Sequence, residues 1–383
     1  MALTLALLAG AGLMLRSFLQ LYRLDLAIDT SRMTTMALRL PENRYPKPEQ
    51  WTAFFRGLQE RLSGIVALSS ITLASAPPFA GAASRELSIE GRTLDAGERP
   101  PAVSYLTIGP RYFETLGTPL VRGRAFGEID GTLGHEGAIV NELFASTHFA
   151  GEDPIGRRIR LTGGSSLGTE APWLTIVGIA PTIRQNAATG PDPVVYVPSR
   201  ADPQPFARLL VRSPMEISAV TALLREEVRA LDRDLPLYGI MAMDQLLSQS
   251  RWPHRVFGIM FAVFASIAIV LSAVGLYAVV AYSVTQRVHE IGVRMAFGAR
   301  APQVVWLVGR RLLVPLAFGM IAGMAGALGV GRLVRRMLVQ TSPSDPMMLV
   351  AIAALLLLVS AAAFFYPVRR ATRLDPVLAL RHE

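Results

Sequence analysis

The sequence contains no cysteine and a single lysine, and each scarcity excludes a class of chemistry. Without cysteine there is no disulfide bond, and no metal site can have thiolate ligands. The lysine, Lys47, lies between two prolines. A phosphate-binding loop of the form G-x-x-x-x-G-K-[ST] needs a lysine directly after its second glycine. This sequence has no such loop, so we predict that another polypeptide hydrolyses any ATP that drives the protein.

Residue spacings typical of metal and catalytic sites are also missing. The histidines show no pair four positions apart on one helix face and no H-x-x-x-H cluster. They are His135, His148, His254, His289 and His382. No spacing among the carboxylates selects a catalytic pair. We predict no catalytic residue, no metal site and no cofactor bound by this chain.

Long apolar runs are abundant, with 51% hydrophobic residues and a mean hydropathy of +0.37. About 20 apolar residues cross the roughly 30 Å hydrocarbon layer of a membrane as a helix. Runs of this length predict membrane helices over about 256–284, 312–331 and 347–368. The shorter run Ala2–Leu15 is either a signal peptide or part of a first membrane helix over 1–20 that is clipped at its N-terminus. We favour the helix, because no basic residue precedes the run.

The net charge of +9 is concentrated beside these apolar runs. Residues 30–255 are close to neutral, with 24 basic and 23 acidic side chains. Five arginines lie in 287–311 and four follow Val368, against three in 332–346. The positive-inside rule therefore places the first loop and the tail in the cytoplasm and the large segment 21–250 outside. Nucleic-acid binding would need a basic folded domain, so we exclude it.

The large segment has a mixed α+β pattern. Alternating apolar residues predict strands at 33–40, 86–89, 103–108, 138–140, 158–161, 174–179, 194–197 and 208–211. Apolar residues at helical spacing predict helices at 49–62, 110–116, 141–149, 216–231 and 243–249. The proline-rich stretch Ala188–Phe206 either divides two subdomains or borders a sheet.

Two short stretches predict specific helix contacts. In the run 312–331, Gly319 and Gly323 form a G-x-x-x-G motif, and Gly326 extends a small-residue face suited to close helix packing. Between 284 and 300, apolar residues recur at spacings of four, three and four, which predicts a short amphipathic helix on the membrane surface. In that helix Glu290 precedes Arg294 by four positions, the favourable orientation for an ion pair.

The amphipathic stretch resembles the signature of the FtsX/MacB-type permease domain of ABC transporters, roughly R-x-x-E-I-G-x-x-x-A-x-G-A. Here the pattern is Arg287, Glu290, Ile291, Gly292, Ala296, Gly298 and Ala299. The tail is similar to the family's P-x-R-R-A-x-x-x-D-P ending, and its matching positions include Arg369, Arg370, Asp375 and Pro376. Residues 140–161, 173–185 and 230–247 resemble the family's periplasmic core domain. The resemblance covers nearly the whole chain and is closest to the duplicated orphan permease group (ADOP), of which this chain would be one half or a fragment.

The resemblance implies a multi-pass protein of the bacterial inner membrane, with four transmembrane helices. A MacB-like periplasmic core domain would occupy 21–250 and an FtsX-like permease domain 251–383. It also implies that the amphipathic stretch is a coupling helix that docks on a separate ABC ATPase, which binds the ATP. Glu290 and Arg294 would then orient this helix, while Ile291 and Met295 would fill a groove on the ATPase.

The implied function is mechanotransmission: ATP hydrolysis moves the outer domain, which exports a drug, peptide, lipid or lipoprotein. The expected partners are the ATPase, the lipid bilayer, and a second permease half or a second copy. The alternative function is that of an FtsX-like regulatory membrane protein whose outer domain activates a cell-wall hydrolase.

Overall fold

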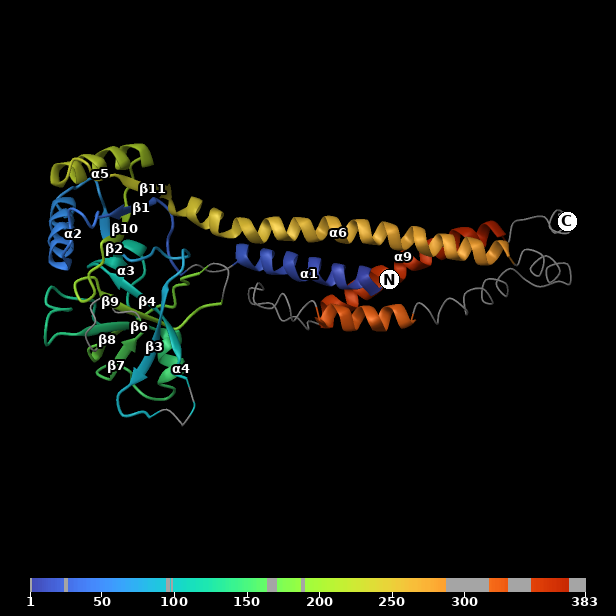
Figure 1. Cartoon of the computed structure of the whole chain (residues 1–383), viewed down its shortest axis with the longest axis horizontal. Helices are drawn as coiled ribbons and strands as arrows, with labels where there is room; N and C mark the ends of the chain where they lie inside the picture. Colours follow the sequence, from blue (N-terminus) through green and yellow to red (C-terminus); the bar gives the residue numbers. More distant parts are fainter. Residues whose placement is uncertain are drawn as a thin grey trace, which may run out of the picture. The chain divides into compact units, whose positions relative to one another are not determined.

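The structure is a computed structural model that describes residues 2–23, 27–93, 97, 99–163, 171–186, 190–286, 317–329 and 346–371. The chain forms two compact units. We call Leu24–Arg251 the head, and Met1–Arg23 together with Trp252–Glu383 the helical unit (Figure 1).

The first part of the head is a four-stranded antiparallel sheet covered by two helices. Its strands are β1 (Met33–Arg39), β2 (Ser70–Ala74), β10 (Phe206–Arg212) and β11 (Leu237–Ala242), in the order β11-β1-β10-β2. Its helices are α2 (Pro48–Ser63), between β1 and β2, and α5 (Ile217–Leu231), between β10 and β11. Two strand–helix–strand units interleaved in this order are a ferredoxin-like arrangement.

Helical periodicity explains why α2 and α5 lie on this sheet. In α2 the buried residues Phe54, Leu58 and Leu62 recur every four positions. In α5 the buried residues Val220, Leu224 and Val228 do the same. Both stripes pack into one core with alternate residues of β1 and β10, because residues two apart on a strand point to the same face.

The second part of the head is a closed barrel, inserted between β2 and β10. Its strands are β3 (Ala83–Ile89), β4 (Ala102–Ile108), β6 (Gly137–Asn141), β7 (Arg158–Thr162), β8 (Leu174–Ala180) and β9 (Val194–Pro198). The pairings β3–β4, β4–β9, β9–β6, β6–β8, β8–β7 and β7–β3 close the ring. The remaining elements here are α3 (Tyr112–Leu116), β5 (Arg122–Gly123) and α4 (Glu142–His148).

Alternation along the barrel strands separates two cores. Val103 and Tyr105 of β4 pack with Val195 and Val197 of β9 in a core that also takes alternate residues of the other barrel strands. Residues on the opposite face of these strands, such as Leu106 and Tyr196, belong to a second core with α3 and Leu210 of β10. This second core therefore joins the barrel to the face of the four-stranded sheet that α2 and α5 leave free.

The helical unit contains α1 (Ala2–Arg23), most of α6 (Met243–Thr285), a helix over Ala317–Gly329, and α9 (Pro346–Ala371). Among the described residues, one helical stretch, Met243–Ser283, is long and apolar enough to cross a membrane. Thr4–Leu13, Ala317–Gly329 and Val350–Ala363 are shorter apolar helices. The number of four transmembrane helices therefore stays a prediction.

Strands β2, β5 and β11 were not predicted, and the structure also informs two stretches that contain prolines. The helix predicted at 243–249 and the apolar run that follows it form one helix, α6, with Pro253 inside. A proline removes one backbone hydrogen bond, and the long apolar helix continues on both sides of it. The proline-rich stretch 188–206 contains β9, the strand predicted at 194–197, which pairs with both β4 and β6. Residues 199–205, after β9, lead from the barrel to β10.

Candidate functional site

The predicted coupling helix lies outside the described residues. This applies to Arg287, Glu290, Ile291, Gly292, Arg294, Met295, Ala296, Gly298 and Ala299, and to Asp375 and Pro376 of the tail. Arg369 and Arg370 belong to the last turn of α9, which ends at Ala371. The docking and tail roles of all these residues stay predictions.

The predicted helix-packing glycines lie in the helix Ala317–Gly329, and Gly323 is buried against α1. A Cβ atom added at Gly323 would lie 2.9 Å from Leu5 Cβ and 3.1 Å from Ala2 Cα. One added at Gly326 would lie 3.5 Å from Ala6 Cβ, an ordinary contact. Gly319, one turn before Gly323, is half-buried. The backbones of the two helices therefore approach closely at Gly323, where a side chain has no room.

Helix α1 is the common partner in the helical unit. Its residues Leu5, Ala9 and Leu13, each four positions apart, are almost completely buried. Leu5 and Ala9 share a cluster with Ala327 and with Ile352 and Leu356 of α9. On another side, Thr4 Oγ1 donates a hydrogen bond to the carbonyl of Ala268 in α6, at 3.5 Å. One helix thus contacts the three others that the structure describes in this unit.

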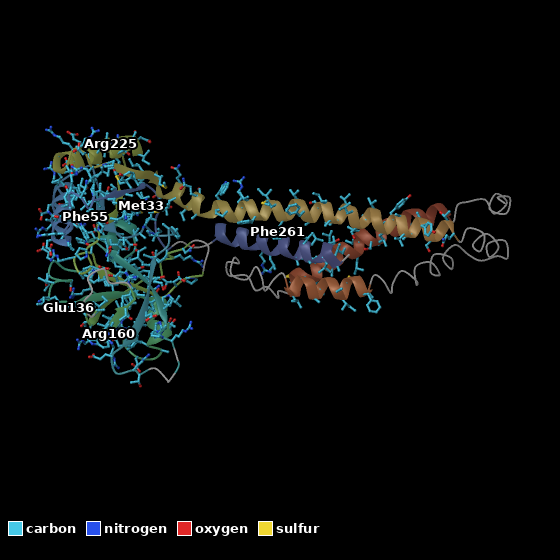
Figure 2. All side chains as sticks on the ribbon, viewed as in Figure 1. Met33, Phe55, Glu136, Arg160, Arg225 and Phe261 are labelled. Atoms are coloured by element: carbon cyan, nitrogen blue, oxygen red, sulfur yellow. The ribbon has the colours of Figure 1, made fainter. Side chains whose placement is uncertain are left out.

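Helix α6 has many exposed apolar side chains. Phe264 is 52% exposed and Leu271 is 66% exposed. Apolar side chains follow the helix along its length, Phe261 among them (Figure 2). Water-soluble surfaces rarely expose a continuous apolar patch of this kind, whereas contact with lipid acyl chains stabilises it.

Arg212 fixes the segment through which the chain enters the head. This segment, residues 27–32, precedes β1. The Arg212 guanidinium donates to the Asp29 carboxylate at 2.6 Å, to the Asp29 carbonyl at 2.6 Å, and to the Thr115 carbonyl of α3 at 2.9 Å. A hydrogen bond from the Ser31 hydroxyl, with help from Arg212, lowers the pKa of Asp29. Nothing in the local sequence marks this arginine, because Asp29 lies 183 positions away.

Replacing Arg212 by alanine is expected to destabilise the head by about 2 kcal/mol, since several hydrogen bonds to one charged group are lost together. Thermal unfolding of the fragment Leu24–Arg251, which has its own core, measures the change. Because the pKa of Asp29 is lowered on folding, its contribution is present above the unfolded pKa and is lost as the pH falls through the folded one. The difference between Arg212→Ala and the native fragment should therefore shrink in acid.

The control is Arg225→Ala on α5, where the arginine is exposed on the surface of the head (Figure 2). A surface substitution of this kind is expected to change stability by less than about 0.5 kcal/mol. Equal unfolding temperatures for the two variants would contradict the role of Arg212.

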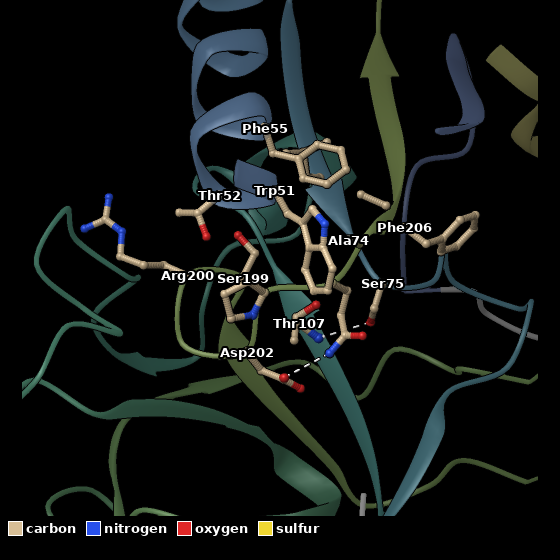
Figure 3. A pocket seen from close by; sticks show the side chains of 14 residues that line it. Trp51, Thr52, Phe55, Ala74, Ser75, Thr107, Ser199, Arg200, Asp202 and Phe206 are labelled. Carbon is tan, nitrogen blue, oxygen red and sulfur yellow. Dashed lines mark hydrogen bonds between the residues drawn. The ribbon is translucent and has the colours of Figure 1, made fainter. Parts of the chain in front are cut away.

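A small groove lies where α2 and the four-stranded sheet meet the barrel (Figure 3). It is lined by Trp51, Thr52, Phe55, Leu73, Ala74, Ser75, Thr107, Ser199, Arg200, Asp202, Pro203, Gln204, Phe206 and Ala207. Asp202 accepts hydrogen bonds from Tyr105 and Gln204, both at 2.9 Å, and the Trp51 indole donates to the Tyr45 carbonyl at 2.7 Å. The volume is about 50 Å³, against about 300–1,000 Å³ for pockets that enclose a drug-sized ligand. This groove is too small to enclose such a ligand.

Two family models match the chain in succession. The MacB-like periplasmic core domain matches residues 5–231, and the FtsX-like permease C-terminal domain matches residues 262–376. The first match covers more than half of the chain and includes most of the head. The second begins within α6 and extends past α9.

Curated relatives include the macrolide export ATP-binding/permease proteins MacB 1/2 of Paracoccus denitrificans (strain Pd 1222) and MacB of Azoarcus sp. (strain BH72). The first is 25% identical over 302 residues, which are 76% of this chain and 43% of the relative. The second is 26% identical over 273 residues, which are 69% of this chain and 40% of the relative. The chain therefore spans less than half the length of these relatives.

Among solved structures, the periplasmic region of MacB from Actinobacillus actinomycetemcomitans is similar to this chain at 15% identity, with a TM-score of 0.39. The similarity covers 58% of this chain and 94% of that one.

Proposed function

Because the chain belongs to the FtsX/MacB-type family of ABC transporter permeases, we propose that it is the permease component of a mechanotransmission transporter. An ABC ATPase that lies outside this sequence supplies the energy, since the single lysine leaves these residues without a phosphate-binding loop. The observation that carries the proposal is the succession of a periplasmic core domain and a permease domain along one chain.

The movement begins at the coupling helix. ATP-driven closure of the ATPase pushes on residues 287–299, which directly follow α6. Four transmembrane helices hold the permease in the inner membrane, and α1 and α6 carry the movement outward. Both are suited to this role, because each is continuous with a segment of the head: α1 precedes β1, and α6 follows β11 directly. This movement requires that the transmembrane helices have two packing arrangements of comparable energy.

The cargo is a hydrophobic drug, a peptide, a lipid or a lipoprotein, and it is handled outside the membrane. The groove between α2 and the barrel is too small to enclose such a cargo, and we place the contact with the cargo on a surface of the head or between subunits. A second permease half, or a second copy of this chain, supplies the opposing surface that contacts the cargo. The alternative, activation of a cell-wall hydrolase, is less favoured because the core-domain match extends over residues 5–231.

The proposal requires the head and the coupling helix to lie on opposite sides of the membrane. The native chain has no cysteine, so single cysteines at Val66 in the head and at Gln286 beside the coupling helix provide unique labels. Both native side chains are exposed. In intact cells, a membrane-impermeant maleimide is expected to label Val66→Cys strongly and Gln286→Cys only after the inner membrane is permeabilised. Equal labelling of both positions in intact cells would overturn the proposed function.

A further inference from the structure

Arg208 is a half-buried cation on β10 for which the described residues provide no carboxylate partner. It lies on the same face of the strand as Arg212, which donates to Asp29 and to the Thr115 carbonyl. By contrast, Arg208 forms no ion pair with a described carboxylate, and its buried Nη1 atom has no hydrogen-bond partner there. Burial also lowers the pKa of its guanidinium. Because a partly buried charge without a partner is unfavourable, the stability of the head does not explain this arginine.

The neighbours of Arg208 on the sheet are small or apolar. Directly opposite it lie Ala37 of β1 and Ala74 of β2, and directly opposed residues on neighbouring strands share a face. Beyond Ala37 on the same row is Tyr238 of β11, which is 51% exposed. The ring of Phe206 lies 5.9 Å from the guanidinium carbon of Arg208. The guanidinium is therefore surrounded by alanines and aromatic rings on the face that α2 and α5 leave free.

Strand β11 is irregular beside this arginine. Its pairing with β1 shifts register between Thr35 and Ala37, and Gly239 has a φ of +54°. A Cβ atom at Gly239 would lie 3.4 Å from Arg208 Nη1, so the glycine leaves space next to the guanidinium. Thr35, on the same face of β1, is fully buried, and its hydroxyl has no hydrogen-bond partner among the described residues. Irregularities of this kind are common next to binding sites, and here one adjoins two unpartnered polar groups.

Arg39 adds a second positive charge to this face. It is exposed, lies directly opposite Phe206, and forms no ion pair with a described carboxylate. It is also the diagonal neighbour of Arg208, because Arg208 lies opposite Ala37, two positions before Arg39. Long side chains at diagonal positions are within reach of one another. Two guanidinium groups at this separation suit a carboxylate or a phosphate group, which accepts paired hydrogen bonds from arginine.

We propose that this face binds an anionic amphiphile, a molecule with one carboxylate or phosphate group and an attached apolar chain. Arg208 and Arg39 hold the anionic group, while Phe206 and Tyr238 contact the first part of the apolar chain. Phe206 and Ala74 also line the small groove (Figure 3), and the chain extends toward that groove. This inference rests on the proposed function, because it names the chemical class of cargo that the head contacts.

Ligand-observed NMR on the full chain in phosphatidylcholine nanodiscs tests the site, with empty nanodiscs as the blank. The probes are hexyl phosphate, hexanoate, inorganic phosphate and hexanol. We expect an anionic amphiphile to bind at least about tenfold more tightly than inorganic phosphate or hexanol, since two buried methylene groups suffice for such a difference. Whichever of hexyl phosphate and hexanoate binds more tightly identifies the headgroup. The inference fails if neither binds more than to empty nanodiscs, or if inorganic phosphate binds equally well.

Substitutions then assign the contacts. Arg208→Gln is expected to weaken binding of the amphiphile roughly tenfold or more, because hydrogen bonds to a charged group are lost. Tyr238→Ser should weaken binding of the amphiphile but leave that of inorganic phosphate unchanged. The matched control is Arg225→Gln, which removes the same charge from the exposed surface of α5 and should bind as the native chain does. Unchanged binding in Arg208→Gln, or an equal loss in Arg225→Gln, would overturn the inference.

Thermal unfolding separates this role from a structural one. Arg208→Gln removes an unpartnered charge, so the unfolding temperature of the variant is expected to equal or exceed that of the native chain. A clear decrease, as expected for Arg212→Ala, would assign Arg208 to the stability of the head instead. These measurements need neither an ATPase nor a defined orientation in cells. They can therefore fail while the labelling of Val66→Cys and Gln286→Cys still supports the proposed function.

Discussion

A double variant, Ile291→Asp with Met295→Asp, is expected to lose its ABC ATPase while it still inserts into the membrane. The apolar stripe of the coupling helix is predicted to fill a groove on the ATPase, and two unpaired carboxylates in that groove are strongly unfavourable. A loss of about 3 kcal/mol corresponds to roughly 100-fold weaker binding. Co-purification with a candidate ABC ATPase from the same organism, followed by a titration of that ATPase onto the chain in nanodiscs, measures the effect.

The control adds the same charge next to the stripe. Gln286 is exposed at the end of α6, where its amide donates to the Tyr282 hydroxyl at 2.8 Å. Gln286→Asp is expected to bind the ATPase with an affinity within a few-fold of the native chain. Labelling of the head at Val66→Cys reports whether each variant is inserted. A double variant that is inserted and retains the ATPase would show that the stripe is not the docking surface.

Local sequence patterns were sufficient for most elements of the head. The buried stripe Phe54, Leu58 and Leu62 recurs at helical spacing, so α2 was predicted within one residue at each end. Strand β7, whose residues alternate clearly, was placed equally well, and so was β9, a continuous apolar run. Strand β2 was missed although Ser70–Ala74 alternates polar and apolar residues, because this alternation extends over only five residues. Strand β11 was missed because Gly239 and a register shift interrupt it.

The assembly of these elements was beyond the reach of local patterns. The barrel closes through pairs such as β4 with β9, whose residues are far apart in sequence, and no short motif encodes such a pairing. The same limitation applies to the contacts at the entrance of the head. Arg212 resembles any other strand arginine until its bonds to Asp29 are seen.

The coupling helix and the packing glycines also differ in how much of each could be predicted from the sequence. The coupling helix could be predicted because its chemistry is carried by neighbouring residues in one short stretch. The packing glycines could be predicted as a small face from their spacing, but the sequence could not tell which helix they contact. The structure places Leu5 and Ala2 of α1 against Gly323. Substituting this glycine with larger residues tests the contact.

Enlarging Gly323 is expected to push α1 away from the helix Ala317–Gly329. An alanine Cβ there would lie 2.9 Å from Leu5 Cβ, 3.1 Å from Ala2 Cα and 3.2 Å from the Ala2 carbonyl oxygen. These atoms belong to the backbone or are bonded directly to it, so the helices must separate. Overpacking of this kind costs about 1–3 kcal/mol and occasionally more. We expect Gly323→Leu to separate the two helices further than Gly323→Ala does. Spin labels at Leu7→Cys on α1 and Phe318→Cys measure the separation in nanodiscs.

The same helix supplies a graded control series. A Cβ at Gly326 meets Ala6 Cβ at an ordinary 3.5 Å, and no described atom lies within 4 Å of one at Gly329. Since alanine favours a helix over glycine by up to about 1 kcal/mol, Gly329→Ala and Gly326→Ala should leave the label distance unchanged. Only the Gly323 variants should lengthen it, with leucine above alanine. Equal distances across the whole series would mean that the two helices do not meet at Gly323, and α1 would then lose its place as the helix that the others contact.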